Sequence, residues 1–455
     1  MFIGIVIVLL VGASTIFWII VGLLRFAAEK FGTDPLAAAP GAPSREGEGA
    51  DVIGIEDVAI LLAAHNESAV IARTIRQAAG HVPLSQIHVV SDGSSDDTVA
   101  IARAEGAQVL DLNPNRGKAG ALVAALDHFQ IVTRFKVMVL LDADTHLAPD
   151  YLDTGLRLFS DPEVVAVAGR VRTLPEPAPP TRLGRVLVSY RERLYVVLQL
   201  FLKYGQAAKR ANAIFIVPGF ASMYRTRVLR HIDIAPPGLV IEDFNMTFEV
   251  HAKQLGRIEF HPRAAVAYTQ DPGTIRDYLN QTRRWSLGFW QTARKHRFRW
   301  RKFWVALGFY ILDITTSAMV YLLLLPLLAA TIVAALLQAS NPNTVLQVDN
   351  AIWPQLHVWS SAVVWSDSLL AIVTPWQVLF VLVLPDYALT LFAAIVLKRP
   401  KLLAVGVFFP IVRAADAWIC LSTLWASRRM HGDGRWVSPE RRLDVVRGEV
   451  ASPGG

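Results

Sequence analysis

Lys136-Val-Met-Val-Leu-Leu-Asp-Ala-Asp-Thr145 decides the fold, because in this stretch five apolar residues lead directly to two aspartates. The apolar run 137–141 predicts the buried central strand of a parallel sheet that helices cover on both faces. Such sheets bind ligands at the carboxyl ends of their strands, where Asp142 and Asp144 would lie on one face. Their hard oxygen atoms suit Mg²⁺ or Mn²⁺, which commonly binds one or two carboxylates together with substrate phosphates. A lone Asp-x-Asp is more often a solvated turn, so the neighbouring segments have to support the metal site.

Strands and helices alternate ahead of this stretch. The predicted strands cover 58–63, 86–91 and 107–110, and the predicted helices cover 68–79, 96–105 and 117–129. This order predicts an α/β domain in which the polar residues after each strand meet at one edge of the sheet. Asp92 would lie there, although helix capping alone also explains its turn, Asp92-Gly-Ser-Ser-Asp-Asp97. Lys118 would lie there too, at a helix N-terminus that suits phosphate or is simply solvated.

The composition indicates a membrane protein. Of 455 residues, 53% are hydrophobic and 18% charged, which is too apolar for an ordinary soluble enzyme of this length. The single cysteine, Cys420, excludes an intrachain disulfide. The net charge of +7 indicates a cytoplasmic Lys/Arg bias and attraction for anionic lipid or a phosphorylated substrate, and it is weak evidence for nucleic acid, so we predict no nucleic-acid partner.

The apolar segments divide the chain into six predicted parts. These are a membrane anchor (1–25), a Pro/Gly-rich linker (26–51), the α/β domain (52–280), an interfacial helix (281–302), a transmembrane region (303–427) and a basic tail (428–455). Arg25 and Lys30 follow the anchor and place the α/β domain on the cytoplasmic side. Three later spans would leave the basic tail outside, so a fourth segment within 353–372 stays open.

Three further patterns fall between these parts. Apolar residues in 183–201 follow helical spacing beside Arg185, Arg191 and Arg193, which favours a helix on the bilayer surface over one packed on the sheet. Residues 214–217 predict another strand. Arg413 and Asp416, three residues apart within an apolar run, would pair with each other or line a polar path.

Two polar motifs follow the central strand. Glu242 and Asp243 stand between apolar residues and open a helical pattern over 244–255, where acids also complement the helix dipole. Repulsion from Glu242 would raise the pKa of Asp243. Gln281-Thr-Arg-Arg-Trp285 leads into aromatic and basic residues, which an interfacial helix alone explains in large part.

Taken in order, these motifs resemble those of the processive family 2 membrane glycosyltransferases, which include cellulose, hyaluronan, chitin and poly-N-acetylglucosamine synthases. The set is Asp-Gly-Ser (92–94), Gly-Lys-Ala (117–119), Asp-x-Asp (142–144), Glu-Asp (242–243) and Gln-x-x-Arg-Trp (281–285). The tail 435–441 is similar to the C-terminal end of poly-N-acetylglucosamine synthases. The resemblance implies a GT-A (Rossmann-like) domain inserted between transmembrane helices, which transfers sugar from a UDP-sugar with inversion.

The resemblance also implies a role for each residue. Asp92 would contact uridine, Lys118 the uracil or diphosphate, and Asp142 and Asp144 the ribose and a Mg²⁺ or Mn²⁺ ion. Asp243, beside Glu242, would be the general base on the acceptor hydroxyl. Arg284 would hold the diphosphate, Trp285 would stack under the acceptor sugar, and Gln281 would bind substrate. Ile241 and Ser91 depart from the family pattern, which usually has Thr and Asp or Asn at these positions.

These implications favour a cell-membrane enzyme that polymerises a β-linked polysaccharide and exports it. UDP-N-acetylglucosamine is favoured over UDP-glucose by the tail alone. The expected partners are the UDP-sugar donor, the growing polysaccharide or a lipid-linked acceptor, and membrane lipids, and the need for an accessory subunit stays open. The alternatives are a non-processive transferase that adds one sugar to a lipid acceptor, and an inactive nucleotide-binding transporter or scaffold.

Overall fold

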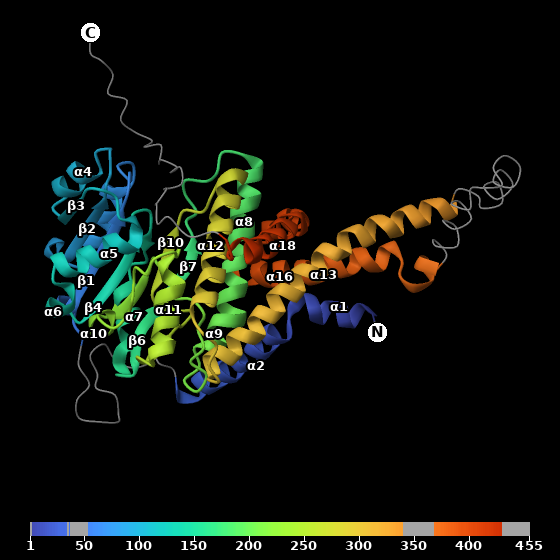
Figure 1. Cartoon of the computed structure of the whole chain (residues 1–455), viewed down its shortest axis with the longest axis horizontal. Helices are drawn as coiled ribbons and strands as arrows, with labels where there is room; N and C mark the ends of the chain where they lie inside the picture. The colour runs from blue at the N-terminus through green and yellow to red at the C-terminus, as the bar shows by residue number, and fades with distance from the viewer. Residues whose placement is uncertain (1, 34–35, 37–52, 340–367, 430–455) are drawn as a thin grey trace, which may run out of the picture. The chain divides into compact units, whose positions relative to one another are not determined.

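The structure is a computed structural model that describes residues 2–33, 36, 53–339 and 368–429 (Figure 1). The chain divides into two compact units, which are described separately. One combines 1–14 with 309–422, and the other, called here the α/β unit, combines 15–308 with 423–455. The tail motif 435–441 and most of the predicted segment 353–372 lie outside the described residues.

A seven-stranded, mostly parallel sheet organises the α/β unit, which confirms the predicted fold class as far as an α/β domain. Four parallel strands pair in the order β3-β2-β1-β4: β1 is Val58–Ala64, β2 is Ile87–Asp92, β3 is Gln108–Leu112 and β4 is Val137–Asp142. Beyond β4 follow β8 (Ser222–Arg225), antiparallel to both neighbours, then β6 (Val164–Ala168) and β9 (Arg257–Glu259). Strand β4 is therefore the middle strand, and Asp142 ends it.

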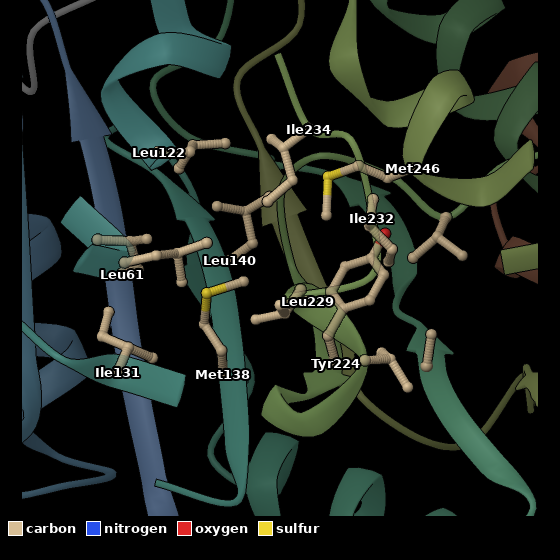
Figure 2. Packing of buried hydrophobic residues seen from close by; sticks show 14 of the residues in the cluster. Leu61, Leu122, Ile131, Met138, Leu140, Tyr224, Leu229, Ile232, Ile234 and Met246 are labelled. Atoms are coloured by element: carbon tan, nitrogen blue, oxygen red, sulfur yellow. The ribbon is translucent and has the colours of Figure 1, made fainter. Parts of the chain in front are cut away.

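Helices cover both faces of this sheet. Alternate residues of β1 point to opposite faces, so Leu61 packs with α5 (Gly117–His128) and α11 (Glu242–Lys253), and Leu62 packs with α3 (Ile71–Ala79) and α7 (Tyr151–Arg157). Figure 2 shows the first cluster, with Leu61 and Leu140 from the sheet and Leu122 and Met246 from the helices. The shorter helices of this unit are α4 (Thr98–Ala104), α6 (Ile131–Arg134), α9 (Tyr204–Gln206) and α10 (Thr226–Leu229).

The predicted strand at 214–217 is wrong. Ile214 and Val217 are buried in the core, but side chains of α11 satisfy their backbone in place of a neighbouring strand. His251 Nε2 donates to the Ile214 carbonyl at 3.0 Å, and Val217 N donates to Thr247 Oγ1 at 2.9 Å. A short buried apolar run alone therefore did not distinguish a strand from a segment held under a helix.

A second, three-stranded sheet carries α8 (Arg182–Val197). Its order is β5 (His146–Leu147), β10 (Val266–Thr269) and β7 (Arg170–Thr173). Helix α8 packs on β7 and runs beside α12 (Ile275–Lys295) (Figure 1). The favoured bilayer-surface position is wrong for two of the three arginines that motivated it, because Arg191 and Arg193 are only 2% and 4% exposed, whereas Arg185 is exposed. Both guanidinium groups lie over aromatic rings, which accommodates the charges inside the unit.

The start of the predicted linker is helical. Helix α2 (Ala13–Ala28) continues into a π-helical turn, Glu29–Thr33, instead of ending at residue 25. Arg25 binds Glu29 at 2.7 Å and Glu259 at 2.9 Å, and Glu29 also accepts a hydrogen bond from Tyr204. Arg25 therefore has a packing role within the α/β unit in addition to its predicted use as a topology signal.

The other unit contains apolar helices, and three described helices are long and apolar enough to cross a bilayer. They are Lys302–Leu337, which belongs to α13 (Lys302–Ala339), then α16 (Pro375–Leu397), and Lys401–Ala426, which combines α17 (Lys401–Val405) and α18 (Phe409–Ala426). A fourth span results if α1 (Phe2–Val11) and α2 count as one broken helix. The predicted N-terminal anchor is thus interrupted at Gly12, whose φ is +88°.

Charged groups in this unit pair across helices. Arg413 lies 3.5 Å from Asp386 of α16 and donates to the Leu10 carbonyl at 2.9 Å. The predicted partner, Asp416, is three residues away on the same helix, so sequence spacing pointed to a local pair where the structure forms a long-range one. Arg413 thereby binds one of the carbonyl groups that the end of α1 leaves without a helical partner.

Candidate active site

Lys118 connects two acidic side chains, Asp142 and Glu242, at the carboxyl edge of the main sheet. It is the second residue of α5, after Gly117, whose φ of +75° turns the chain from β3 into the helix. Lys118 Nζ lies 2.9 Å from Asp142 Oδ1, 3.0 Å from Glu242 Oε1 and 3.2 Å from the Gly219 carbonyl. The ammonium group thus forms ion pairs with two carboxylates and donates a hydrogen bond to the Gly219 carbonyl. The implied contact of Lys118 with uracil or diphosphate stays a prediction.

Asp243 is held by the backbone of Gly219. Gly219 N donates to Asp243 Oδ2 at 2.7 Å, and a Cβ atom added to Gly219 would lie 1.9 Å from Asp243 Oδ1. Only glycine therefore allows this close approach. Asp243 Oδ1 is buried without a hydrogen-bond partner among the described residues, so the carboxyl group keeps one oxygen for a further partner.

The pKa values of Glu242 and Asp243, which are neighbours in the sequence, are shifted in opposite directions. Burial opposes the charge of Lys118, but Asp142 and Glu242 outweigh it and raise the pKa of the amine. Burial also opposes ionisation of Glu242, yet Lys118 lowers the pKa of this carboxyl. Burial and then the charge of Glu242 raise the pKa of Asp243 well above its ordinary value, in the direction that the sequence predicts. Asp243 is therefore the stronger base of the pair.

Asp92 lies at the same edge, at the end of β2. Its side chain is fully buried, and Oδ1 accepts a hydrogen bond from Arg116 N at 2.7 Å, in the turn that leads to Lys118. Oδ2 has no hydrogen-bond partner among the described residues. Because an unsatisfied buried carboxylate oxygen is costly, this atom is a candidate ligand contact, and helix capping does not account for it.

Asp142 and Asp144 are the predicted ligands of a metal ion. Asp142 Oδ1 faces Lys118, and Asp144 is buried. In the described part of the chain no group of three or more His, Cys, Asp or Glu side chains is arranged to hold a metal. Two carboxylates at one strand end fit a Mg²⁺ or Mn²⁺ ion that substrate phosphates complete, and they do not fit an all-protein cage.

The Gln-x-x-Arg-Trp residues lie in the middle of α12, which begins at Ile275 and not at the predicted 281. Arg191 of α8 lies over the Trp285 ring, 4.6 Å from its centroid, and donates to Gln281 Oε1 at 3.4 Å. Arg284 is exposed, and no hydrogen bond or ion pair ties it to another described residue. Arg191 of α8 thus holds the side chains of Trp285 and Gln281, whereas the exposed side chain of Arg284 is available to a ligand.

The hydroxyl group of Tyr195 connects α8 to Asp271, which precedes α12 in the chain. Tyr195 of α8 donates to Asp271 Oδ1 at 2.7 Å, and Thr173 donates to the other oxygen of Asp271 at 2.7 Å. Burial raises the pKa of Tyr195, and the negative charges of Asp271 and Asp144 add to this rise. Asp144 therefore lies close enough to Tyr195 of α8 for its charge to act on this hydroxyl group.

Sequence reasoning missed four of these groups: Arg191, Tyr195, Gly219 and Asp271. A basic residue at a helical core position was a usable signal for Arg191, because a buried charge needs a specific partner. Nothing local marked Gly219, since the close contact depends on Asp243, a residue distant in the sequence.

Residues 137–338 match the sequence profile of the family described as "Glycosyl transferase family group 2". These 202 of the 455 residues are therefore similar to family 2 glycosyltransferases. The match begins at β4 and includes every predicted site residue except Asp92 and Lys118, which precede it. Lys118 nevertheless joins Asp142 and Glu242 of the matched region by ion pairs.

Three known proteins are similar to this chain. The succinoglycan biosynthesis protein ExoU of Rhizobium meliloti is 33% identical over 101 residues, which cover 21% of this chain and 28% of ExoU. The probable glycosyltransferase YdaM of Bacillus subtilis is 28% identical over 244 residues, which cover 51% of this chain and 54% of YdaM. The chain thus spans about half, or less, of the curated relatives it matches. The solved mannosyltransferase PcManGT of Pyrobaculum calidifontis, in complex with GDP-Man and Mn²⁺, has a TM-score of 0.47 and 19% identity, and the match covers 80% of this chain and 97% of PcManGT.

Proposed function

We propose that this chain is a family 2 glycosyltransferase with a GT-A fold, which transfers sugar from a UDP-sugar to a growing β-linked polysaccharide, with inversion at the sugar C1. The observation that carries the proposal is the cluster of Lys118, Asp142, Glu242 and Asp243 at the carboxyl edge of the sheet. The relative named for succinoglycan biosynthesis supports a polysaccharide product. The apolar helices support a cell-membrane enzyme with a cytoplasmic catalytic domain that exports its product.

In this proposal Asp243 is the general base. The acceptor oxygen forms a bond to C1 while the bond from C1 to the diphosphate oxygen breaks, and the acceptor proton passes to Asp243. The buried oxygen of Asp243 without a partner supports this role, because it can accept that proton. Glu242 and Lys118 act through Asp243: they hold a fixed negative and a fixed positive charge beside it.

The donor would be held from several elements. Asp92 offers a buried oxygen to the uridine, and Arg284 offers an exposed guanidinium to the diphosphate, which Arg can bind in bidentate fashion. Asp144 and Asp142 would hold Mg²⁺ or Mn²⁺, which when bound neutralises charge on the leaving diphosphate. Trp285 and Gln281 would bind the acceptor sugar, because an indole offers a flat apolar face to a pyranose.

The central test is Asp243→Asn in membranes supplied with Mg²⁺ or Mn²⁺ and a panel of radiolabelled UDP-sugars, UDP-N-acetylglucosamine and UDP-glucose among them. Loss of the general base predicts a fall in transfer by a factor of about 10² to 10⁴, with donor binding retained. Polymer at wild-type levels from Asp243→Asn would refute the assignment of the base. A wild-type chain that binds UDP-sugar but transfers none would refute the enzyme and favour a transporter or scaffold.

The length of the product tests processivity. Gel electrophoresis or mass spectrometry of the wild-type product distinguishes a polymer from a lipid carrying one added sugar. A single addition would contradict the polysaccharide synthase and leave the non-processive transferase.

A further inference from the structure

Arg191 is a buried charge that contacts α12, the helix of Gln281 and Trp285, at several points. Its guanidinium carbon lies 4.6 Å from the Trp285 ring centroid and 4.7 Å from the Tyr278 ring centroid. Its Nη2 atom donates to Thr282 Oγ1 at 3.1 Å and to Gln281 Oε1 at 3.4 Å. One side chain of α8 therefore contacts four residues of α12, across two turns of that helix.

This geometry fixes the orientation of two side chains. A planar cation over one face of an indole determines the plane of the ring, because both groups are flat and attract each other. The opposite face of Trp285 is then the one left for a ligand, and Trp285 is half-buried. The bond to Gln281 Oε1 directs the amide oxygen toward Arg191, so the amide NH₂ group points away and can donate to a sugar hydroxyl.

We propose that Arg191 is a positioning residue for the acceptor: it sets the plane of Trp285 and the orientation of the Gln281 amide on which the acceptor sugar rests. This inference rests on the proposed function, since it assigns Trp285 and Gln281 to the acceptor. Arg191 itself touches no reacting atom and acts through α12.

The alternative is that Arg191 only stabilises the packing of α8. The same helix provides a matched comparison in Arg193, which is equally buried and lies 4.7 Å from the Tyr190 ring centroid. Tyr190 belongs to α8 and not to the Gln-x-x-Arg-Trp segment. If packing were the whole role of Arg191, loss of either guanidinium would have the same effect on the enzyme.

The experiment compares Arg191→Met, Arg191→Lys, Arg193→Met, Trp285→Ala and the double variant Arg191→Met/Trp285→Ala, each as full-length protein in detergent. The donor is the UDP-sugar that is active in the panel above, and the acceptor probe is the β-linked tetrasaccharide of the same sugar. The readouts are KM for donor and acceptor separately, kcat, product length and the midpoint of thermal unfolding.

Arg191→Met should raise the acceptor KM by about tenfold and shorten the polymer, while the donor KM stays unchanged. Arg191→Lys should restore part of the effect, since it keeps the charge but loses the planar group. Arg193→Met should lower the unfolding midpoint to a similar extent without changing the acceptor KM. The effect of the double variant should be smaller than the product of the two single effects, because part of the effect of Arg191 passes through Trp285 and the rest through Gln281.

Two results would overturn the inference while leaving the proposed function intact: equal acceptor KM values for Arg191→Met and wild type, or effects of Arg191→Met and Trp285→Ala that multiply in the double variant. A change in acceptor KM for Arg193→Met as large as that for Arg191→Met would also overturn it, in favour of packing. A wild-type chain that transfers no sugar from any donor would refute the proposed function and the inference together.

Discussion

At the scale of single residues, Lys118 stabilises the ionised form of one of the acids beside it. Burial opposes ionisation of Glu242, but its ion pair with Lys118 lowers the pKa of that carboxyl, whereas burial and the charge of Glu242 raise the pKa of Asp243. A carboxyl whose pKa is raised in this way matches the base strength that proton transfer near neutral pH requires. The two adjacent acids therefore differ in basicity, and Asp243 is the stronger base.

Gly219 gives a prediction that involves no change of charge. Gly219→Ala should displace the Asp243 carboxyl, since the new Cβ atom would lie 1.9 Å from Oδ1 in the present geometry. We expect a fall in kcat of about tenfold or more with a small change in donor KM, because displacement by about an ångström near the reacting groups is costly. Steady-state kinetics with the active UDP-sugar measure this.

The control for that variant is Gly308→Ala, whose added Cβ would meet only Phe298, at an ordinary 3.8 Å. Gly308 lies within α13, where alanine is a better helix former than glycine. Equal kcat values for Gly219→Ala and wild type would show that the hydrogen bond from Gly219 N does not hold Asp243 in its working position.

At the scale of elements, the sequence correctly predicted the strands that a local residue pattern specifies. Strands β1 and β4 are continuous buried apolar runs that lead to polar residues, β2 is buried but contains His88 and Ser91, and each lies within one or two residues of its predicted bounds. The run at 214–217 is also apolar, yet its hydrogen bonds go to α11. For α8 the basic residues suggested the bilayer surface, whereas aromatic partners from α12 keep Arg191 inside. Partners distant in sequence decided both cases.

The site residues divide in the same way, between those that a local motif indicates and those whose partners are distant in the sequence. The acids Asp142, Glu242 and Asp243 were identified from motifs, because their chemistry and their place after apolar runs are local properties. The partners of Lys118 were not predicted, because the segments of Asp142, Gly219 and Glu242 meet this residue only in the folded sheet.

The break between α1 and α2 gives a prediction at this scale. Gly12 has a φ of +88°, and a Cβ atom there would lie 2.7 Å from Asp313 Oδ2, which accepts a hydrogen bond from Ser14 N. Gly12→Ala should therefore destabilise the protein by about 1–3 kcal/mol, the usual cost of an unfavourable backbone conformation. Thermal unfolding of the purified protein in detergent measures the change.

Gly4→Ala, in the same helix α1, is the matched control, because no atom lies within 4 Å of its added Cβ. Alanine at that position should leave the unfolding midpoint unchanged or raise it slightly, as expected in a helix interior. If Gly12→Ala proved as stable as Gly4→Ala, the break at Gly12 would not be a fixed feature of the helix.

At the scale of the whole molecule, buried histidines connect stability to pH. Burial lowers the pKa of His88, His251 and His296 to about 4, from an ordinary value of 6.5. Between these values the unfolded chain binds more protons than the folded chain. Stability that is fully present above pH 6.5 is therefore lost as the pH falls toward 4. Asp243 acts in the opposite direction, because its pKa is raised, but it is one group against four, since burial also lowers the pKa of His146 to about 4.

The unfolding midpoint should therefore fall between pH 7 and pH 5, and His88→Phe should reduce this dependence. His88 is fully buried between Phe129 and Phe135, so phenylalanine fits the same aromatic surroundings and cannot take up a proton. Each such histidine contributes at most about 1.4 kcal/mol per pH unit in this range. His128→Phe, at an exposed position of α5, should leave the dependence unchanged. A midpoint that is constant from pH 7 to pH 5, or a slope that His88→Phe does not reduce, would mean that carboxylates and not buried histidines limit acid stability.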